Sequence, residues 1–164
     1  IASNEKVICF DVEAVATGVG HNDRKPCRVS VVDEGGDILY DAIISVSEGV
    51  YDPLTAITGL SREDIARGVP FEEAKASLKA TCGPDTVLVG QCIDGDIAWM
   101  ELEKGVDYAR TVDIAKHFRL WNPKKDRWIY FSLARLAYAL LKKTIHGGAD
   151  DSVEDAQVSM RLFQ

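Results

Sequence analysis

Four acidic residues stand at the ends of apolar segments, where folding could gather their carboxylates around metal ions. Asp11 and Glu13 lie two residues apart at the end of one such segment, Asp96 follows a second, and Asp155 falls in the first turn of a C-terminal helix. Residues i and i+2 of a strand point to one face, so Asp11 and Glu13 can reach the same ion. Hard divalent cations prefer oxygen ligands, and two of them ~3.5–4 Å apart assist in-line displacement at phosphorus. The alternative is that each is an ordinary surface or capping acid, because the chain has 26 acidic residues.

The size and composition are those of one globular domain. The chain has 164 residues, 46% of them hydrophobic and 27% charged, which argues against a disordered, collagen-like or coiled-coil protein. No apolar run reaches the ~18 residues of a membrane span, so we expect no membrane partner. Because the chain begins with Ile1 rather than Met, we expect residues 1–164 to be a single domain excised from a longer protein, whose other domains would be its partners.

Strands are expected first and helices later. Apolar or alternating runs predict strands at 7–10, 28–32 and 38–45, the last two joined by a turn at 33–37. Further strands are predicted at 87–90 and 108–112, and helices from 61 and over 71–80, 94–102, 132–141 and 152–163. The last helix is expected to have Ser152 as its cap. This order predicts an α/β domain in which helices pack on a mixed sheet.

The net charge and the cysteine spacing argue against several classes of protein. A net charge of −7 argues against a protein that coats nucleic acid through many phosphate contacts, but not against an enzyme that holds one strand end through bound metal ions. The cysteines do not form a C-x-x-C pair or show zinc-finger spacing with histidine, and we expect them to be reduced: Cys9, Cys27, Cys82 and Cys92. An intracellular location follows, with nucleus and cytoplasm not distinguished.

The acidic segments resemble the motifs of a known family. The sequence carries Phe-Asp-Val-Glu at 10–13, Leu-Val-Gly-Gln at 88–91 leading to Asp96, and Asp-Ser-Val-Glu-Asp-Ala at 151–156. In this order and spacing they resemble the DEDD superfamily of 3′–5′ exonucleases, which have the ribonuclease H-like fold of the RNase T type. The nearest branch is that of the eukaryotic RNA exonucleases and poly(A)-removing nuclease domains. The resemblance runs from about residue 7 to residue 163.

The resemblance implies both a fold and an activity. The fold would be a five-stranded mixed sheet, flanked by helices, with its second strand antiparallel to the rest. The activity would be 3′–5′ hydrolysis of single-stranded RNA, or also of DNA, with release of nucleoside 5′-monophosphates. Two divalent ions, Mg²⁺ or Mn²⁺, would be held by the four acids: Asp11, Glu13, Asp96 and Asp155.

Two positions depart from the family pattern. Gln91 replaces a frequent histidine and can still donate a hydrogen bond to substrate. Asp150 stands five residues before Asp155, where the family's general-base histidine is expected, and Asp151 stands where a subgroup has tyrosine. A carboxylate beside two cations is a weaker base than imidazole, so we expect reduced or altered activity. His146 is the best of the three histidines as a substitute; the others are His21 and His117.

Because Asp150 stands where the family's general-base histidine is expected, two other functions remain open. The main alternative is a catalytically inactive exonuclease-like module that binds RNA or a protein partner. A third possibility is a different metal-dependent phosphatase on the same fold.

Basic and aromatic residues alternate between positions 120 and 132, a composition suited to stacking unpaired bases and holding phosphates. The predicted substrate contacts there are Trp128, Lys124, Lys125 and Arg127. Trp121 and Phe131 are expected to pack against the domain instead, because large aromatic side chains usually bury their area.

Overall fold

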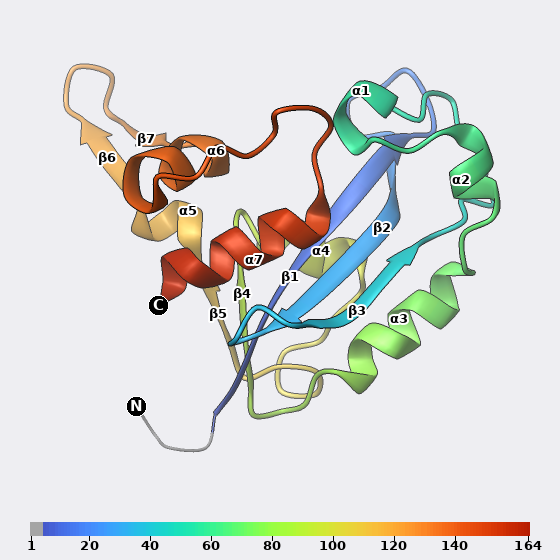
Figure 1. Ribbon diagram of the computed structural model, residues 1–164, viewed down its shortest axis with the longest axis horizontal. Helices are drawn as coiled ribbons and strands as arrows, with labels where there is room; N and C mark the ends of the chain where they lie inside the picture. The colour runs from blue at the N-terminus through green and yellow to red at the C-terminus, as the bar shows by residue number, and fades with distance from the viewer. Residues whose placement is uncertain (1–4) are drawn as a thin grey trace.

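The computed structural model describes residues 5–164, which form a five-stranded sheet with helices on both faces (Figure 1). The strand order is β3-β2-β1-β4-β5. Strand β2 runs antiparallel to β1 and β3, whereas β4 and β5 run parallel to β1. The expectation of a five-stranded mixed sheet with the second strand reversed is confirmed. The strands are β1 (Lys6–Ala16), β2 (Arg24–Asp33), β3 (Ile38–Ile43), β4 (Thr86–Gly90) and β5 (Arg110–Asp113).

The alternation of side chains along β1 divides the core into two layers. Ile8 and Phe10 are fully buried in a cluster on the side of helix α3 (Phe71–Ala80). Cys9 points to the opposite face and packs against α7 (Ser152–Phe163) through Ala156 and Met160. Because alternate residues of a strand share a face, Asp11 and Glu13 lie on the α7 side. The shorter helices are α1 (Thr55–Thr58), α2 (Arg62–Ala66), α4 (Asp94–Trp99), α5 (Ile114–His117) and α6 (Leu133–Leu136).

Local capping signals predicted two helix starts correctly and misplaced a third. A helix was predicted from residue 61, and Ser61 and Asp64 form a capping box there at the start of α2. Pro70 precedes α3, which covers the predicted residues. The cap of α7 is Asp151, whose carboxylate accepts a hydrogen bond from the Val153 amide, and not Ser152. The Ser152 side chain is instead fully buried, because its hydroxyl has a partner inside the domain.

The first strand is longer than its apolar run. The sequence predicted that β1 ends before Asp11, but the strand continues to Ala16 and pairs with β2 as far as Arg24. Its pairing register shifts between Glu13 and Ala14. The two acids therefore project from a paired strand and not from a loop.

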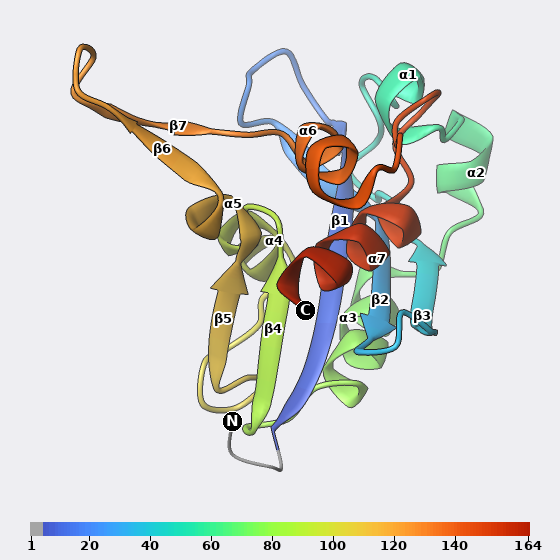
Figure 2. The same ribbon diagram turned by 60° about the vertical axis from the view of Figure 1, so that its left-hand side comes forward.

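The segment near 120–131, for which the sequence predicted neither a strand nor a helix, is a hairpin of β6 (Arg119–Asn122) and β7 (Arg127–Tyr130). Figure 2 shows it extending away from the sheet and helices. The prediction that Trp121 packs against the domain is wrong, because the hairpin carries Trp121 outward and leaves it 47% exposed. Phe131, at the base of the hairpin, does pack against the α7-side core.

The predicted helix at 132–141 is also less regular than expected. It consists of α6 followed by a π-helical segment at Ala137–Leu141. All four cysteines are free thiols, as predicted. Within residues 5–164, every helix is too short or too polar to cross a membrane.

Candidate active site

Two elements bring three of the predicted acids together. Asp11 and Glu13 project from β1, and Asp155 comes from the first turn of α7, which crosses that face of the sheet. One carboxylate oxygen from each lies within 4.8 Å of the other two. This spacing lets the three carboxylates contact a common cation.

Asp96 is the fourth acid and borders the same cluster. It lies in the first turn of α4 and is 8% exposed, as are Glu13 and Asp155. Burial, followed by the charge of Asp96 and then that of Asp155, raises the pKa of Asp11 well above its usual range. The strands and helices thus place all four acids in one electrostatic environment.

The electrostatics of the cluster favour a cation. Burial and then the nearby charges of Asp150 and Asp155 raise the pKa of Glu13 to about 7. Burial and then the charge of Glu13 raise the pKa of Asp96 to about 8. Four such carboxylates ionise together only when positive charge offsets their repulsion. The donors are all hard oxygen atoms, as Mg²⁺ or Mn²⁺ requires, so these residues fit a divalent metal centre.

His146 is the histidine that lies on the acid cluster. Its Nε2 is 2.7 Å from Oδ1 of Asp155, and its Nδ1 is 3.5 Å from Oδ1 of Asp150. Burial lowers the pKa of His146, but the hydrogen bond to Asp155 and the charges of Asp155 and Asp150 outweigh it, so the net shift is upward. The imidazole therefore occupies the neighbourhood in which the family pattern predicts a general base.

The chain reaches this position through an unusual turn. His146 adopts a left-handed backbone conformation with φ of 58° and is followed by Gly147 and Gly148. The Asp150 amide then donates a 2.6 Å hydrogen bond to the Ile57 carbonyl in α1. Spacing along the chain did not reveal this arrangement, because the family's base lies five residues before the last acid and His146 lies nine before it.

The other two histidines have different surroundings. Nδ1 of His117 is 3.0 Å from the backbone carbonyl of Asp113, the residue that caps its helix α5. His21 lines a cavity of about 440 Å³ that also touches Glu13, Arg24 and Trp99. Sequence analysis did not single out Arg24 or Trp99; the one available signal was an aromatic residue three positions after Asp96 in a helix.

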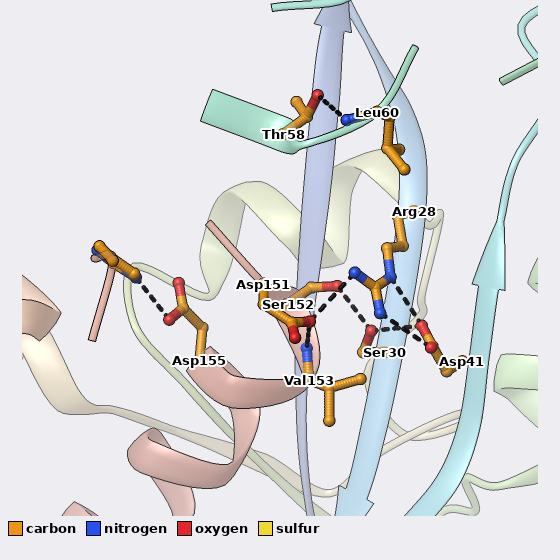
Figure 3. Close-up of polar contacts among 10 residues, drawn as sticks. Arg28, Ser30, Asp41, Thr58, Leu60, Asp151, Ser152, Val153 and Asp155 are labelled. Carbon is orange, nitrogen blue, oxygen red and sulfur yellow. Dashed lines mark hydrogen bonds and ion pairs between the residues drawn. The ribbon is translucent and has the colours of Figure 1, made fainter. Parts of the chain in front are cut away.

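A polar network, buried at Ser30 and Ser152 and more exposed at its acidic residues, holds the start of α7 against the sheet (Figure 3). Arg28 of β2 makes two 2.9 Å hydrogen bonds to Asp41 of β3, and its Nη1 lies 3.1 Å from Asp151. Burial alone would raise the pKa of Asp41, but hydrogen bonds from Arg28 and Ser30 lower it. The Ser30 hydroxyl is also 2.6 Å from the Ser152 hydroxyl. Because Asp155 lies one turn further along α7, this network sets where its carboxylate points.

The predicted substrate residues lie apart from the acids. Nε2 of Gln91 donates a 3.1 Å hydrogen bond to the Phe131 carbonyl, so this amide holds the base of the hairpin. Trp128 is in β7, and the remaining three are in or beside the turn of the hairpin: Lys124, Lys125 and Arg127. A substrate role for these residues remains a prediction.

Comparison with known proteins supports the same family. No protein-family model matches the sequence. RNA exonuclease 4 of Gibberella zeae is 33% identical over 97% of this chain, and the apoptosis-enhancing nuclease of Rattus norvegicus is 32% identical over 97% of it. The chain spans about half the length of these relatives, 48% in each case.

Solved structures share the fold. The Pan2 catalytic unit of Neurospora crassa matches 96% of this chain with a TM-score of 0.75 and 24% identity, and the chain covers 26% of it. A Pan2 module of Saccharomyces cerevisiae, in complex with AACCAA RNA, matches 96% with a TM-score of 0.78 and 21% identity, and the chain covers 28% of it. The sheet order and the solved structures show the ribonuclease H-like fold, and together with the sequence relatives and the acidic motifs they support an exonuclease domain of the DEDD type.

Proposed function

We propose that this domain is a divalent-metal-dependent 3′–5′ exonuclease that hydrolyses single-stranded RNA and releases nucleoside 5′-monophosphates. The observation that carries the proposal is the convergence of buried carboxylates from β1 and α7 within 4.8 Å, with an imidazole hydrogen-bonded to one of them. The choice of RNA is supported by the relatives named RNA exonuclease 4.

The acid cluster would hold two Mg²⁺ or Mn²⁺ ions. Asp11, Glu13 and Asp155 supply the oxygen atoms that lie closest together, and Asp96 adds the fourth carboxylate from α4. Bound ions of this kind would activate water and stabilise the negative charge that develops on the phosphate. The protein contributes the fixed spacing of these oxygens and a largely buried setting, in which charges interact more strongly than in water.

His146 would accept the proton of the attacking water at Nε2, once metal binding by Asp155 releases this nitrogen from its hydrogen bond with that carboxylate. Its Nε2 lies at the edge of the cluster, and Asp150 beside Nδ1 orients the ring. In this proposal Asp150 supports the base and does not replace it. The activity expected is accordingly higher than a carboxylate base alone would allow.

The cavity beside Glu13 fits the terminal nucleoside. Trp99 offers an aromatic surface for a base, and Arg24 offers a cation for phosphate. A strand end that entered this cavity would place its last phosphodiester next to the acids.

The test uses an oligoribonucleotide labelled at its 5′ end, with Mn²⁺ or Mg²⁺, and Asp11→Asn as control. We expect a ladder that shortens from the 3′ end, release of nucleoside 5′-monophosphates, and loss of both with a chelator. No product above that of Asp11→Asn would contradict the proposal and favour the inactive binding module, in which Asp150 has abolished catalysis. Release of phosphate from small monoesters in place of nucleotides would indicate a phosphatase.

A further inference from the structure

The β6–β7 hairpin carries a face of aromatic and cationic side chains. Arg119 pairs with Tyr130 across the two strands, and Trp121 pairs with Trp128. These two pairs are separated by the Leu120–Ile129 pair, so the four side chains share one face and Leu120 and Ile129 share the other. Within residues 5–164, the two strands pair with each other alone.

The aromatic face is assembled but left open to solvent. The Trp121 and Trp128 rings meet edge to face with centroids 5.3 Å apart, and the Arg119 guanidinium lies 4.1 Å from the Trp128 centroid. Trp121, Trp128 and Tyr130 nevertheless remain 47%, 42% and 52% exposed. A face with this much exposed aromatic area on a short projecting element is typical of a binding surface.

The charge of the hairpin is opposite to that of the whole chain. The chain carries a net charge of −7, but residues 119–130 contain four cations against one acid, Asp126. The cations of the turn are Lys124, Lys125 and Arg127, and among the residues the structure describes none of them forms an ion pair. This local positive charge is available to an anionic partner.

One end of the hairpin contacts the segment that leads into α4. The Phe131 carbonyl, directly after β7, accepts a 3.1 Å hydrogen bond from Gln91. Asp113, at the end of β5 and one short helix before the hairpin, accepts a 3.0 Å hydrogen bond from the neighbouring Cys92 amide. Gln91 and Cys92 lie between β4 and α4, the helix that supplies Asp96 to the acid cluster. The base of the hairpin therefore adjoins the segment that leads to the acid site.

We propose that the Arg119, Trp121, Trp128 and Tyr130 face is a stacking platform for single-stranded RNA upstream of the 3′ end that occupies the acid cluster. Bases would stack on the exposed rings while the cations of the turn contact the backbone phosphates. The combination of π-faces and unpaired cations favours a nucleic acid over an apolar protein surface. The placement of the RNA 3′ end in the acid cluster rests on the proposed exonuclease function. Binding of RNA to the platform can be tested separately from that function.

The experiment separates long from short RNA. Single-strand sites span about 4–16 nucleotides, so we compare an RNA of about 12 nucleotides with one of about 3. Fluorescence anisotropy without divalent metal measures affinity for the longer RNA, and nucleotide release with Mn²⁺ measures turnover of the shorter one. Because stacking is worth about 1–3 kcal/mol per base, Trp128→Ala is expected to weaken binding of the longer RNA about 5- to 150-fold and to leave turnover of the shorter RNA unchanged.

Matched variants control for folding and for general charge effects. Trp128→Phe keeps a ring and should restore most of the affinity, and Tyr138→Ala removes a 68% exposed ring outside the hairpin and should change nothing. Lys124→Glu with Lys125→Glu should weaken binding and reduce its salt dependence. Arg161→Glu, an exposed reversal on α7, should have a much smaller effect.

Three results would overturn the platform. Unchanged affinity of Trp128→Ala for the longer RNA would leave this face to a protein partner. Equal losses in long-RNA binding and short-RNA turnover would show that the hairpin acts through the site and not as a separate surface. Equal affinity for a DNA strand of the same sequence would remove RNA as the specific occupant. If the wild-type protein binds RNA through the hairpin but releases no nucleotides, the exonuclease proposal fails and the platform stands.

Discussion

At the scale of single residues, the chemistry depends on which group stands beside the four acids. The family pattern points to position 150, and this chain has Asp there. The structure places the His146 ring between Asp150 and Asp155. The candidates for accepting the proton of the attacking water are therefore His146 and Asp150. Each side chain can be replaced without changing the other.

The first prediction distinguishes these two side chains. His146→Ala is expected to lower kcat about 10²- to 10⁴-fold, the usual contribution of a general base, and to leave the melting temperature nearly unchanged. Asp150→Ala is expected to lower it less than about tenfold, because it orients the ring only. Single-turnover kinetics with a labelled RNA measure both, and His117→Ala, a ring bonded to the capping residue of α5, is the control.

Asp150→His gives a separate answer. If Asp150 itself occupies the base position, this change should raise the rate. If His146 is the base, it should not, because a second imidazole would remove the carboxylate that orients the first. Full activity of His146→Ala would exclude His146 from the reaction.

At the scale of elements, the position of α7 depends on β2. The N-terminal turn of this helix is held by the Arg28–Asp151 contact and by the buried hydrogen bond between Ser30 and Ser152. These residues are more than 100 positions apart in the chain, so the contact is purely tertiary. It joins the strand next to β1 to the helix that carries Asp155.

We expect Arg28→Ala to destabilise the domain by about 1–3 kcal/mol, because Asp41, in a partly buried setting, loses the two hydrogen bonds from Arg28 and keeps only the one from Ser30. Nucleotide release should also fall, since α7 loses one of its fixed contacts. The matched control is Arg110→Ala, which removes a similar two-bonded pair with Glu5 on a more exposed strand and should cost about 0–1 kcal/mol. Urea unfolding measures both, and equal losses would show that the network has no special role.

At the scale of the whole molecule, folding buries acidic side chains and raises their pKa values above those of the unfolded chain. The pKa of Glu13 is raised from 4.5 to about 7 and that of Asp96 from 3.8 to about 8, both first by burial. Between these unfolded and folded values the folded state binds more protons than the unfolded state. Stability without metal must therefore fall as the pH rises.

Thermal melts at pH 5 and pH 8 test this directly. Without divalent ions, the melting temperature should be lower at pH 8 than at pH 5. Mg²⁺ or Mn²⁺ should raise it, and more at pH 8, because the ions bind the deprotonated carboxylates; at about 100 times Kd the gain is about 2.7 kcal/mol. Asp11→Asn should shrink both effects. A metal-free melting temperature that rises with pH would contradict the burial of these acids.

The relatives of this chain are longer than the chain itself. It spans about half of each relative named above, 48% of RNA exonuclease 4 from Gibberella zeae.

Short-range signals in the sequence account for much of the fold and part of the site. Alternation along β1 put Asp11 and Glu13 on one face, and capping residues marked the starts of α2 and α3. The family resemblance supplied the five-stranded mixed sheet with its reversed second strand, but not the order of the strands. These features depend on residues that are near one another in the sequence, or on family motifs that follow one another in a fixed order. They can therefore be predicted from the sequence.

Tertiary structure decided which distant groups meet. It brought His146 to Asp155 through a left-handed turn and two glycines, although no spacing rule links them. It joined Arg28 of β2 to the cap of α7, and it turned the segment around Trp121 into a projecting hairpin. Each of these outcomes depends on contacts between segments whose relative positions arise only when the sheet and α7 pack together, and local sequence preferences do not encode such contacts.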